Sequence, residues 1–173
     1  MRSRENRLNR IAALAAVLAL WAACPAEAAT LIVDRTAILA EHNNYRAELR
    51  EPPLVWSEQL AQGAQRWADT MAALNRLQHS GTPGTGENIA MWRGANSSLS
   101  LMIGNWAREK YLFERGIFPN VSRDKNWAAV GHYTQIVWRN TTEVGCGTSK
   151  NGRTDFMVCW YNPPGNIVGQ NPY

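Results

Sequence analysis

The order of hydrophobic periods along the chain restricts its fold more than any other feature. Helical spacing of apolar residues predicts three helices: residues 36–50, a segment capped by Ser57, and a segment starting at Ser98 or Ser100. Strand patterns lie at residues 87–92, before the third of these helices, and at 132–138, 144–148 and 155–161, after it. The predicted helices lie mainly in the first part of the chain and the predicted strands mainly in the last part. This order does not give the βαβ alternation of a doubly wound fold. This order predicts an α+β fold with a sheet between helices.

The first 28 residues resemble an export signal rather than part of a fold. Four arginines precede an apolar run at residues 11–23, and Ala26-Glu27-Ala28 provides a small-x-small cleavage site. The run is shorter than the roughly 20 residues that span a membrane. A lipoprotein site at Cys24 is the alternative, and Trp21 argues against it. We therefore expect a signal peptide at 1–28 and a secreted, extracellular or periplasmic product with one domain at 29–173.

The charge of the expected mature chain excludes one class of partner. Residues 29–173 carry 14 basic and 12 acidic side chains, a net charge of +2 against +4 for the whole chain. No cluster of lysine or arginine stands out in this region, so we expect no nucleic-acid partner. A single domain of this size is expected to be a monomer.

Two cysteines remain after the expected cleavage, Cys146 and Cys159. In an oxidising compartment an even pair predicts a disulfide. A hairpin register that pairs the two also pairs Lys150 with Asp155 and leaves residues 151–154 as a four-residue loop. A two-residue Asn-Gly turn would place Cys146 opposite Met157 instead. We therefore predict the four-residue loop, or a bulge that corrects the shorter one.

Two compact motifs lie near the end of the chain. The first is Gly-His-Tyr-Thr-Gln-Ile-Val-Trp-Arg-Asn-Thr-Thr at 131–142, and the second is Val-Cys-Trp-Tyr-Asn-Pro-Pro-Gly-Asn at 158–166. With Gly86-Glu87-Asn88 upstream, they resemble the signatures of the CAP superfamily, which comprises cysteine-rich secretory, antigen 5 and pathogenesis-related class-one proteins. The resemblance covers residues 34–173 and is greatest to the plant pathogenesis-related type. It implies a three-layer α-β-α sandwich with an antiparallel central sheet.

Four side chains correspond to the cleft tetrad of this family: His79, Glu87, Glu109 and His132. Glu109 also stands out by itself, because it lies on the apolar stripe of the third predicted helix, where a carboxylate needs a partner or an open cleft. Imidazole nitrogens suit a divalent transition metal such as Zn²⁺ or Cu²⁺, and nearby carboxylates would orient the rings. His79 and His132 are the expected metal ligands. The alternative is a self-contained hydrogen-bond network without an ion.

A metal-assisted hydrolase, acting as a protease or an esterase, is the rival interpretation of the same four residues. Ser80 or Thr134 would be the nucleophile, and neither lies in a Gly-x-Ser-x-Gly context. We expect no catalytic residue and no required cofactor. His42 is predicted to face the core, bonded to backbone or to another side chain.

The resemblance also implies a ligand. Family members bind sterols or fatty acids through loops and grooves between helices, and residues 111–127 of this chain concentrate aromatic side chains. The competing interpretation is that these aromatics cover the core. Some plant members release their last eleven residues after a Cys-Asn-Tyr motif, but Trp160 replaces that asparagine here. Our prediction is a secreted, non-enzymatic protein that binds a sterol, a fatty acid, an extracellular protein or an envelope surface.

Overall fold

The computed structural model describes residues 32–173, so the predicted signal peptide and Cys24 lie outside the described residues. A four-stranded sheet with the order β1-β3-β4-β2 forms the centre of the domain. β2 (Gly86–Arg93), β3 (Glu143–Asn151) and β4 (Thr154–Asn162) are antiparallel. The two-residue β1 (Val55–Trp56) adds a parallel edge to β3. The sheet is therefore antiparallel, as predicted, except at this short edge.

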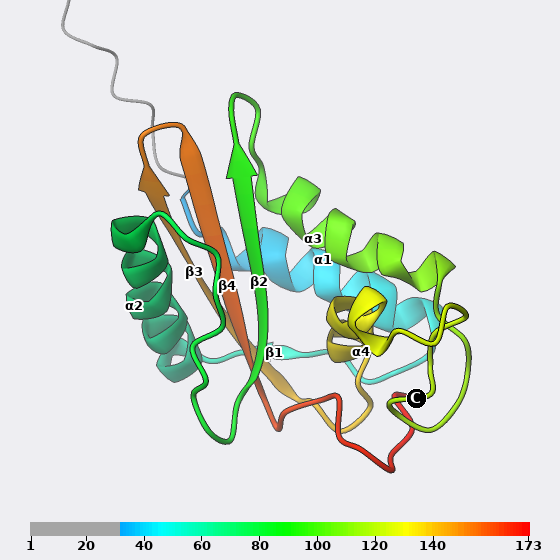
Figure 1. The fold of residues 1–173 in the computed structure, drawn as a ribbon. Coiled ribbons are helices and arrows are strands. Elements are labelled where there is room, and N and C mark those ends of the chain that lie inside the picture. The colour runs from blue at the N-terminus through cyan, green and yellow to red at the C-terminus, as the bar shows by residue number, and fades with distance from the viewer. Residues whose placement is uncertain (1–31) are drawn as a thin grey trace, which may run out of the picture.

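Helices cover both faces of the sheet (Figure 1). α2 (Glu58–Leu74) lies alone on one face, and α1 (Arg35–Glu48), α3 (Leu99–Arg108) and α4 (Gly131–Ile136) lie on the other. Two glycines let α2 approach β3 closely, since a Cβ on Gly145 or Gly147 would lie 2.2 or 2.3 Å from the helix backbone. The predicted three-layer α-β-α sandwich is confirmed.

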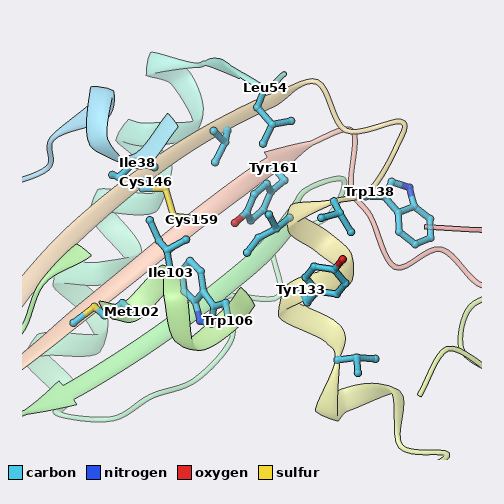
Figure 2. Packing of buried hydrophobic residues seen from close by; sticks show 14 of the residues in the cluster. Ile38, Leu54, Met102, Ile103, Trp106, Tyr133, Trp138, Cys146, Cys159 and Tyr161 are labelled. Atoms are coloured by element: carbon cyan, nitrogen blue, oxygen red, sulfur yellow. A yellow bond between two sulfur atoms is a disulfide. The ribbon is translucent and has the colours of Figure 1, made fainter. Parts of the chain in front are cut away.

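The main core lies between the sheet and the three helices of the second face. Figure 2 shows how Ile38 from α1, Ile103 and Trp106 from α3, and Tyr161 from β4 meet there. A smaller cluster beneath α2 contains Met71, Phe156 and Val158, all fully buried. Successive side chains of β4 thus belong alternately to the two clusters, because successive residues of a strand point to opposite faces of the sheet.

The first three helices begin close to the predicted positions. Asp34 caps α1 by accepting hydrogen bonds from two backbone N–H groups, and Ser98 caps α3 by accepting one from Leu101. Ser57 precedes α2 as predicted, but its side chain makes no capping hydrogen bond.

The strand predicted at residues 132–138 is wrong, because Gly131–Ile136 form the helix α4. The apparent alternation of polar and apolar residues does not correspond to two faces, since every residue from Tyr133 to Trp138 is buried. Contacts from elsewhere favour the helix: the Glu109 carboxylate accepts the N–H groups of His132 and Tyr133 in its first turn. Tertiary interactions have overridden the local pattern.

The terminal hairpin has the predicted register and a shorter loop. Cys146 pairs with Cys159 and Lys150 with Asp155, and the predicted Cys146–Cys159 disulfide is present. Asn151 also pairs with Thr154, so the turn has two residues instead of the predicted four. Gly152 begins this turn with a φ of +57°, a conformation that glycine adopts at little cost.

A side chain closes part of the outer edge of β3. The N–H and C=O groups of Thr148 point away from β4, and both bond to the side-chain amide of Gln65 on α2, at 3.1 and 2.7 Å. Further back along β3, the N–H of Ser57 just after β1 donates to the carbonyl of Val144. The amide of Gln65 therefore continues the pairing where β1 has ended.

Candidate functional site

His132 and Glu109 form the first of two histidine–glutamate pairs. His132 lies in the first turn of α4, and Glu109 directly follows the last residue of α3. The Nδ1 atom of the imidazole lies 2.6 Å from Oε1 of the carboxylate. Oε2 accepts the backbone N–H of His132 at 2.9 Å and that of Tyr133 at 3.1 Å. One carboxylate thus fixes both the ring and the start of the helix that carries it.

An indole ring supports the same histidine. Trp106 stacks on the His132 imidazole with 5.8 Å between ring centroids and 13° between ring planes. The indole is itself held by a hydrogen bond from its Nε1 to the carbonyl of Ile89 on β2. Nδ2 of Asn88 donates to the carbonyl of His132 and so ties α4 to the same strand. The His132 ring is therefore fixed by several elements at once.

His79 and Glu87 form the second pair, which is held differently. His79 lies on the loop between α2 and β2, and Glu87 is the second residue of β2. The imidazole Nδ1 lies 2.7 Å from Oε1 of Glu87, which also accepts the N–H of Ser80 at 2.9 Å. The indole Nε1 of Trp160 donates to Oε2 at 2.8 Å. The carboxylate is 8% exposed, whereas the imidazole is 63% exposed.

The charges of this second pair stabilise each other. The hydrogen bond to Glu87 raises the pKa of His79 above its ordinary value, against the opposing effect of burial. Burial opposes ionisation of Glu87, but the donors His79, Ser80 and Trp160 outweigh it and hold the pKa of the carboxyl below its ordinary value. Glu87 is therefore an ionised acceptor, and the proton on Nδ1 of His79 points toward it.

The two pairs meet at one cavity of about 280 Å³. His79, Glu87 and His132 line it, while Glu109 is absent from the lining and bonds His132. Part of its wall is formed by Pro164, Gly165 and Asn166 near the end of the chain. The four residues of the predicted tetrad are thus brought together as two pairs, with three members at the surface of the cavity.

Hydrogen bonds hold the chain end against α4 to form that wall. The N–H of Gly165 donates to Oε1 of Gln135 at 2.9 Å, and Nδ2 of Asn166 donates to the carbonyl of Gly131 at 2.9 Å. Thr134 Oγ1 donates to Oδ1 of Asn166 at 2.6 Å. The Thr134 hydroxyl is therefore a buried structural group rather than a nucleophile beside a histidine. Ser80 Oγ accepts the N–H of Thr82 and likewise bonds no imidazole.

His42 lies away from the cleft, fully buried in α1. Its Nδ1 lies 2.8 Å from the carbonyl of Ile38, and its Nε2 lies 2.8 Å from the hydroxyl of Tyr161. The prediction of a core-facing histidine bonded to backbone or to another side chain is confirmed, and the ring bonds both.

A second, larger cavity of about 460 Å³ opens along α3, with Tyr45 of α1 and Trp92 of β2 also in its lining. Aromatic and basic side chains line it, including Tyr45, Trp92, Tyr111, Arg108 and Lys110. The aromatic segment predicted at 111–127 divides into two groups. Phe113 and Phe118 are buried in the core, whereas Tyr111, Ile117 and Trp127 are 70%, 55% and 47% exposed.

Sequence reasoning missed the two tryptophans that hold the cleft, Trp106 and Trp160. Trp106 has a sequence signal, since it precedes Glu109 by three residues on the same helical stripe. The contact of Trp160 has none, because it depends on the pairing of β2 with β4, which are far apart in the sequence.

Two general properties of the described region bear on the site. Each helix within residues 32–173 is too short or too polar to span a membrane. In the same region, no three His, Cys, Asp or Glu side chains are grouped so as to hold a metal ion together. Any ion in the cleft would therefore have at most two ligands of these types from the described chain.

Comparison with known proteins identifies the family. The model of the cysteine-rich secretory protein family (CAP) matches residues 39–161. A pathogenesis-related protein of the PR-1 type from Sambucus nigra is 36% identical over 133 residues, covering 76% of this chain and 77% of that protein. Venom allergen 5 from Polistes dominula is 34% identical and covers 81% and 71%.

Solved structures agree with the sequence comparison. BmVAL-1 superposes with a TM-score of 0.67 at 28% identity, covering 80% of this chain and 81% of that one. NaASP2, whose crystal structure was solved with Zn²⁺, superposes with a TM-score of 0.66 at 22% identity, covering 80% and 84%. The match of a family model over most of the chain, together with these relatives, shows that the chain belongs to the CAP family of cysteine-rich secretory, pathogenesis-related and venom-allergen proteins.

Proposed function

We propose that this chain is an exported binding protein whose cleft holds a divalent cation, Zn²⁺ or Cu²⁺, between His79 and His132. The main observation behind this proposal is that Nδ1 of each histidine lies 2.6–2.7 Å from a carboxylate oxygen. A carboxylate only accepts, so Nδ1 carries the proton and the lone pair of each neutral ring lies on Nε2. A metal-binding histidine commonly has this arrangement.

The donor set fits a weakly held ion with open coordination positions. Two imidazoles are fewer protein ligands than the three of a usual catalytic zinc site or the four of a structural site. Water or a bound ligand would complete the coordination. The Zn²⁺ in the crystal structure of NaASP2 supports the choice of metal by similarity of fold.

Binding without catalysis is the better interpretation of the cleft. Both candidate nucleophiles, Ser80 and Thr134, are hydrogen-bonded to groups other than an imidazole. The rival, hydrolysis by a metal-activated water, predicts turnover of an ester, peptide or glycosidic substrate that is lost in Glu87→Gln at near-native stability. Absence of any turnover above that variant removes the rival.

Two observations support export of the protein. The first 28 residues have the pattern of a secretory signal, and the Cys146–Cys159 disulfide requires an oxidising compartment to persist. An extracellular or periplasmic location is therefore part of the proposal. It also places the cleft where extracellular ions, proteins or envelope surfaces would reach it.

Calorimetric titration of the metal-free mature protein with Zn²⁺ tests the cation site. We expect His79→Ala and His132→Ala each to abolish binding and to leave the fold intact. His42→Gln is the matched control, because it removes a histidine that has no access to the cleft. Unchanged affinity in either cleft variant removes that histidine from the site.

The groove along α3 favours a second ligand, a fatty acid. Its volume of about 460 Å³ lies within the range of ligand pockets, and it combines aromatic walls with the cations of Arg108 and Lys110. An aliphatic chain would pack against Tyr45 and Trp92, and its carboxylate would lie near the cations. Native mass spectrometry of protein purified from its secreting cells should show a lipid-sized adduct, which Leu101→Glu in the groove wall should eliminate.

A further inference from the structure

Trp160 lies beside Glu87 as its cross-strand partner. Residues 87 and 160 are paired in the register of β2 and β4, so their side chains lie on the same face of the sheet. The indole Nε1 donates to Oε2 of Glu87 at 2.8 Å. The other carboxylate oxygen faces His79 and the N–H of Ser80. Trp160 therefore holds the far side of the carboxylate that orients the imidazole.

Helix α2 leaves space for this indole at one residue. A Cβ on Gly63 would lie 2.1 Å from Cζ3 and 2.6 Å from Cε3 of Trp160. The indole therefore lies against the bare helix backbone, where any larger residue would displace it. A glycine inside a helix costs about 1 kcal/mol relative to alanine. Helix α2 thus has a residue that is unfavourable in helices, Gly63, at the position where the indole of Trp160 packs.

The two histidines of the cleft differ in how they are held. His132 lies within a helix, bonds Glu109 and stacks on Trp106. His79 lies on a loop with most of its ring exposed, and its side chain bonds Glu87. The orientation of His79 therefore depends on how rigidly Glu87 is fixed. A carboxylate that turned would no longer select the Nδ1–H form of the ring.

From these contacts we infer that Trp160 is a positioning residue for the cation site: through Glu87 it fixes the ring and the tautomer of His79, and Gly63 provides the space that it needs. The inference rests on the proposed cation site for its consequence, since a fixed Nδ1–H tautomer keeps the Nε2 lone pair directed to the cleft.

The test compares three variants of the mature, metal-free protein. Trp160→Phe keeps a ring at the site and removes its N–H donor. Gly63→Ala keeps the indole but adds a methyl group that clashes with it. Trp56→Phe is the matched control, because it also replaces an indole by a phenyl ring, on β1 at the edge of the sheet opposite to β2. Circular dichroism and thermal unfolding establish that each variant is folded.

Nitrogen-15 NMR of the imidazoles gives the direct measurement. In the wild type we expect His79 and His132 both as the Nδ1–H tautomer. Trp160→Phe and Gly63→Ala should each give a mixture of tautomers at His79 and leave His132 unchanged, since Glu109 holds His132 independently. Trp56→Phe should change the tautomer of neither histidine. A merely structural role for Trp160 would not change one histidine and spare the other.

Titration with Zn²⁺ gives the functional measurement. Loss of a contact that orients a metal ligand typically lowers affinity 10- to 100-fold, and we expect about tenfold for Trp160→Phe. Gly63→Ala should have a similar effect, and the double variant should lose no more than either single one, because both act through the same contact.

The outcomes separate the two proposals. A wild type that binds no Zn²⁺ overturns the proposed cation site, while the tautomer of His79 still decides the role of Trp160. An unchanged tautomer at His79 in Trp160→Phe and Gly63→Ala overturns the positioning role, and so does a change that affects His132 equally. Additive losses of affinity in the double variant would show that Gly63 does not act through the indole.

Discussion

The buried imidazole of His42 should make the protein sensitive to acid. Burial lowers the pKa of His42 from 6.5 to about 4, and the nearby charge of Arg46 adds to this effect. The neutral ring uses both nitrogens, since Nδ1 donates to the carbonyl of Ile38 and Nε2 accepts from the hydroxyl of Tyr161. A second proton would place a positive charge on a fully buried ring that already has the positive charge of Arg46 nearby.

The size of the effect follows from the difference in pKa between the unfolded and folded states. Between pH 6.5 and about 4 the unfolded chain binds a proton at His42 that the folded protein does not bind. Stability therefore rises with pH in this window and falls on acidification. A difference of 2.5 units at 1.36 kcal/mol per unit gives about 3 kcal/mol, all of it present above pH 6.5 and lost by about pH 4.

Urea denaturation between pH 4 and pH 7.5 measures this contribution. We expect His42→Gln to flatten the pH dependence of the unfolding free energy by about 3 kcal/mol, whatever its stability at neutral pH. His79→Gln is the matched control, because His79 contributes a pH dependence of opposite sign. The pKa of His79 is raised in the folded protein, so the stability that it contributes is lost as pH rises. Solvent screening keeps that control effect small, since His79 is 63% exposed. Equal pH dependence in wild type and His42→Gln would refute the assignment of a neutral buried His42.

Three further substitutions test the packing of the domain, each by urea denaturation. Replacing Cys146 and Cys159 together by serine should lower the unfolding free energy by about 3 kcal/mol, because the bridge closes a loop of about 14 residues; an unchanged midpoint would contradict this. Gly147→Ala should cost about 2 kcal/mol through a clash with the α2 backbone, whereas the control Gly104→Ala, with open space around its Cβ, should be neutral or stabilising. Arg46→Lys should cost about 3 kcal/mol, because the buried guanidinium donates to four backbone carbonyls that a lysine cannot all reach; full stability would show that water replaces these bonds.

Local patterns in the sequence predicted the elements that depend on local physics. The helical stripes of α1, α2 and α3 and the pairing of Cys146 with Cys159 rest on spacing and turn geometry. Residues 131–136 could not be assigned in this way, because α4 is a short helix buried on nearly all sides. Its first turn is stabilised by Glu109, which lies 23 residues earlier in the chain. A contact between residues so far apart produces no periodic pattern of polar and apolar residues in the sequence.

The candidate site, too, was predictable from the sequence only in part. Motif matching selected His79, Glu87, Glu109 and His132, and the structure pairs each imidazole with a carboxylate. The arrangement as two separate pairs could not be predicted, because it depends on how α3, α4 and β2 are placed around the cleft. The contribution of Trp160 also depends on the register of two strands that are 73 residues apart at the contact.

The amide of Gln65 has a consequence for how copies of this protein behave toward one another. An open strand edge offers unpaired N–H and C=O groups to any neighbouring chain and so favours aggregation. By bonding both groups of Thr148, Gln65 occupies the place that a foreign strand would take along β3. A single side chain thereby helps to keep the disulfide-bonded hairpin of one molecule from pairing with the hairpin of a second molecule.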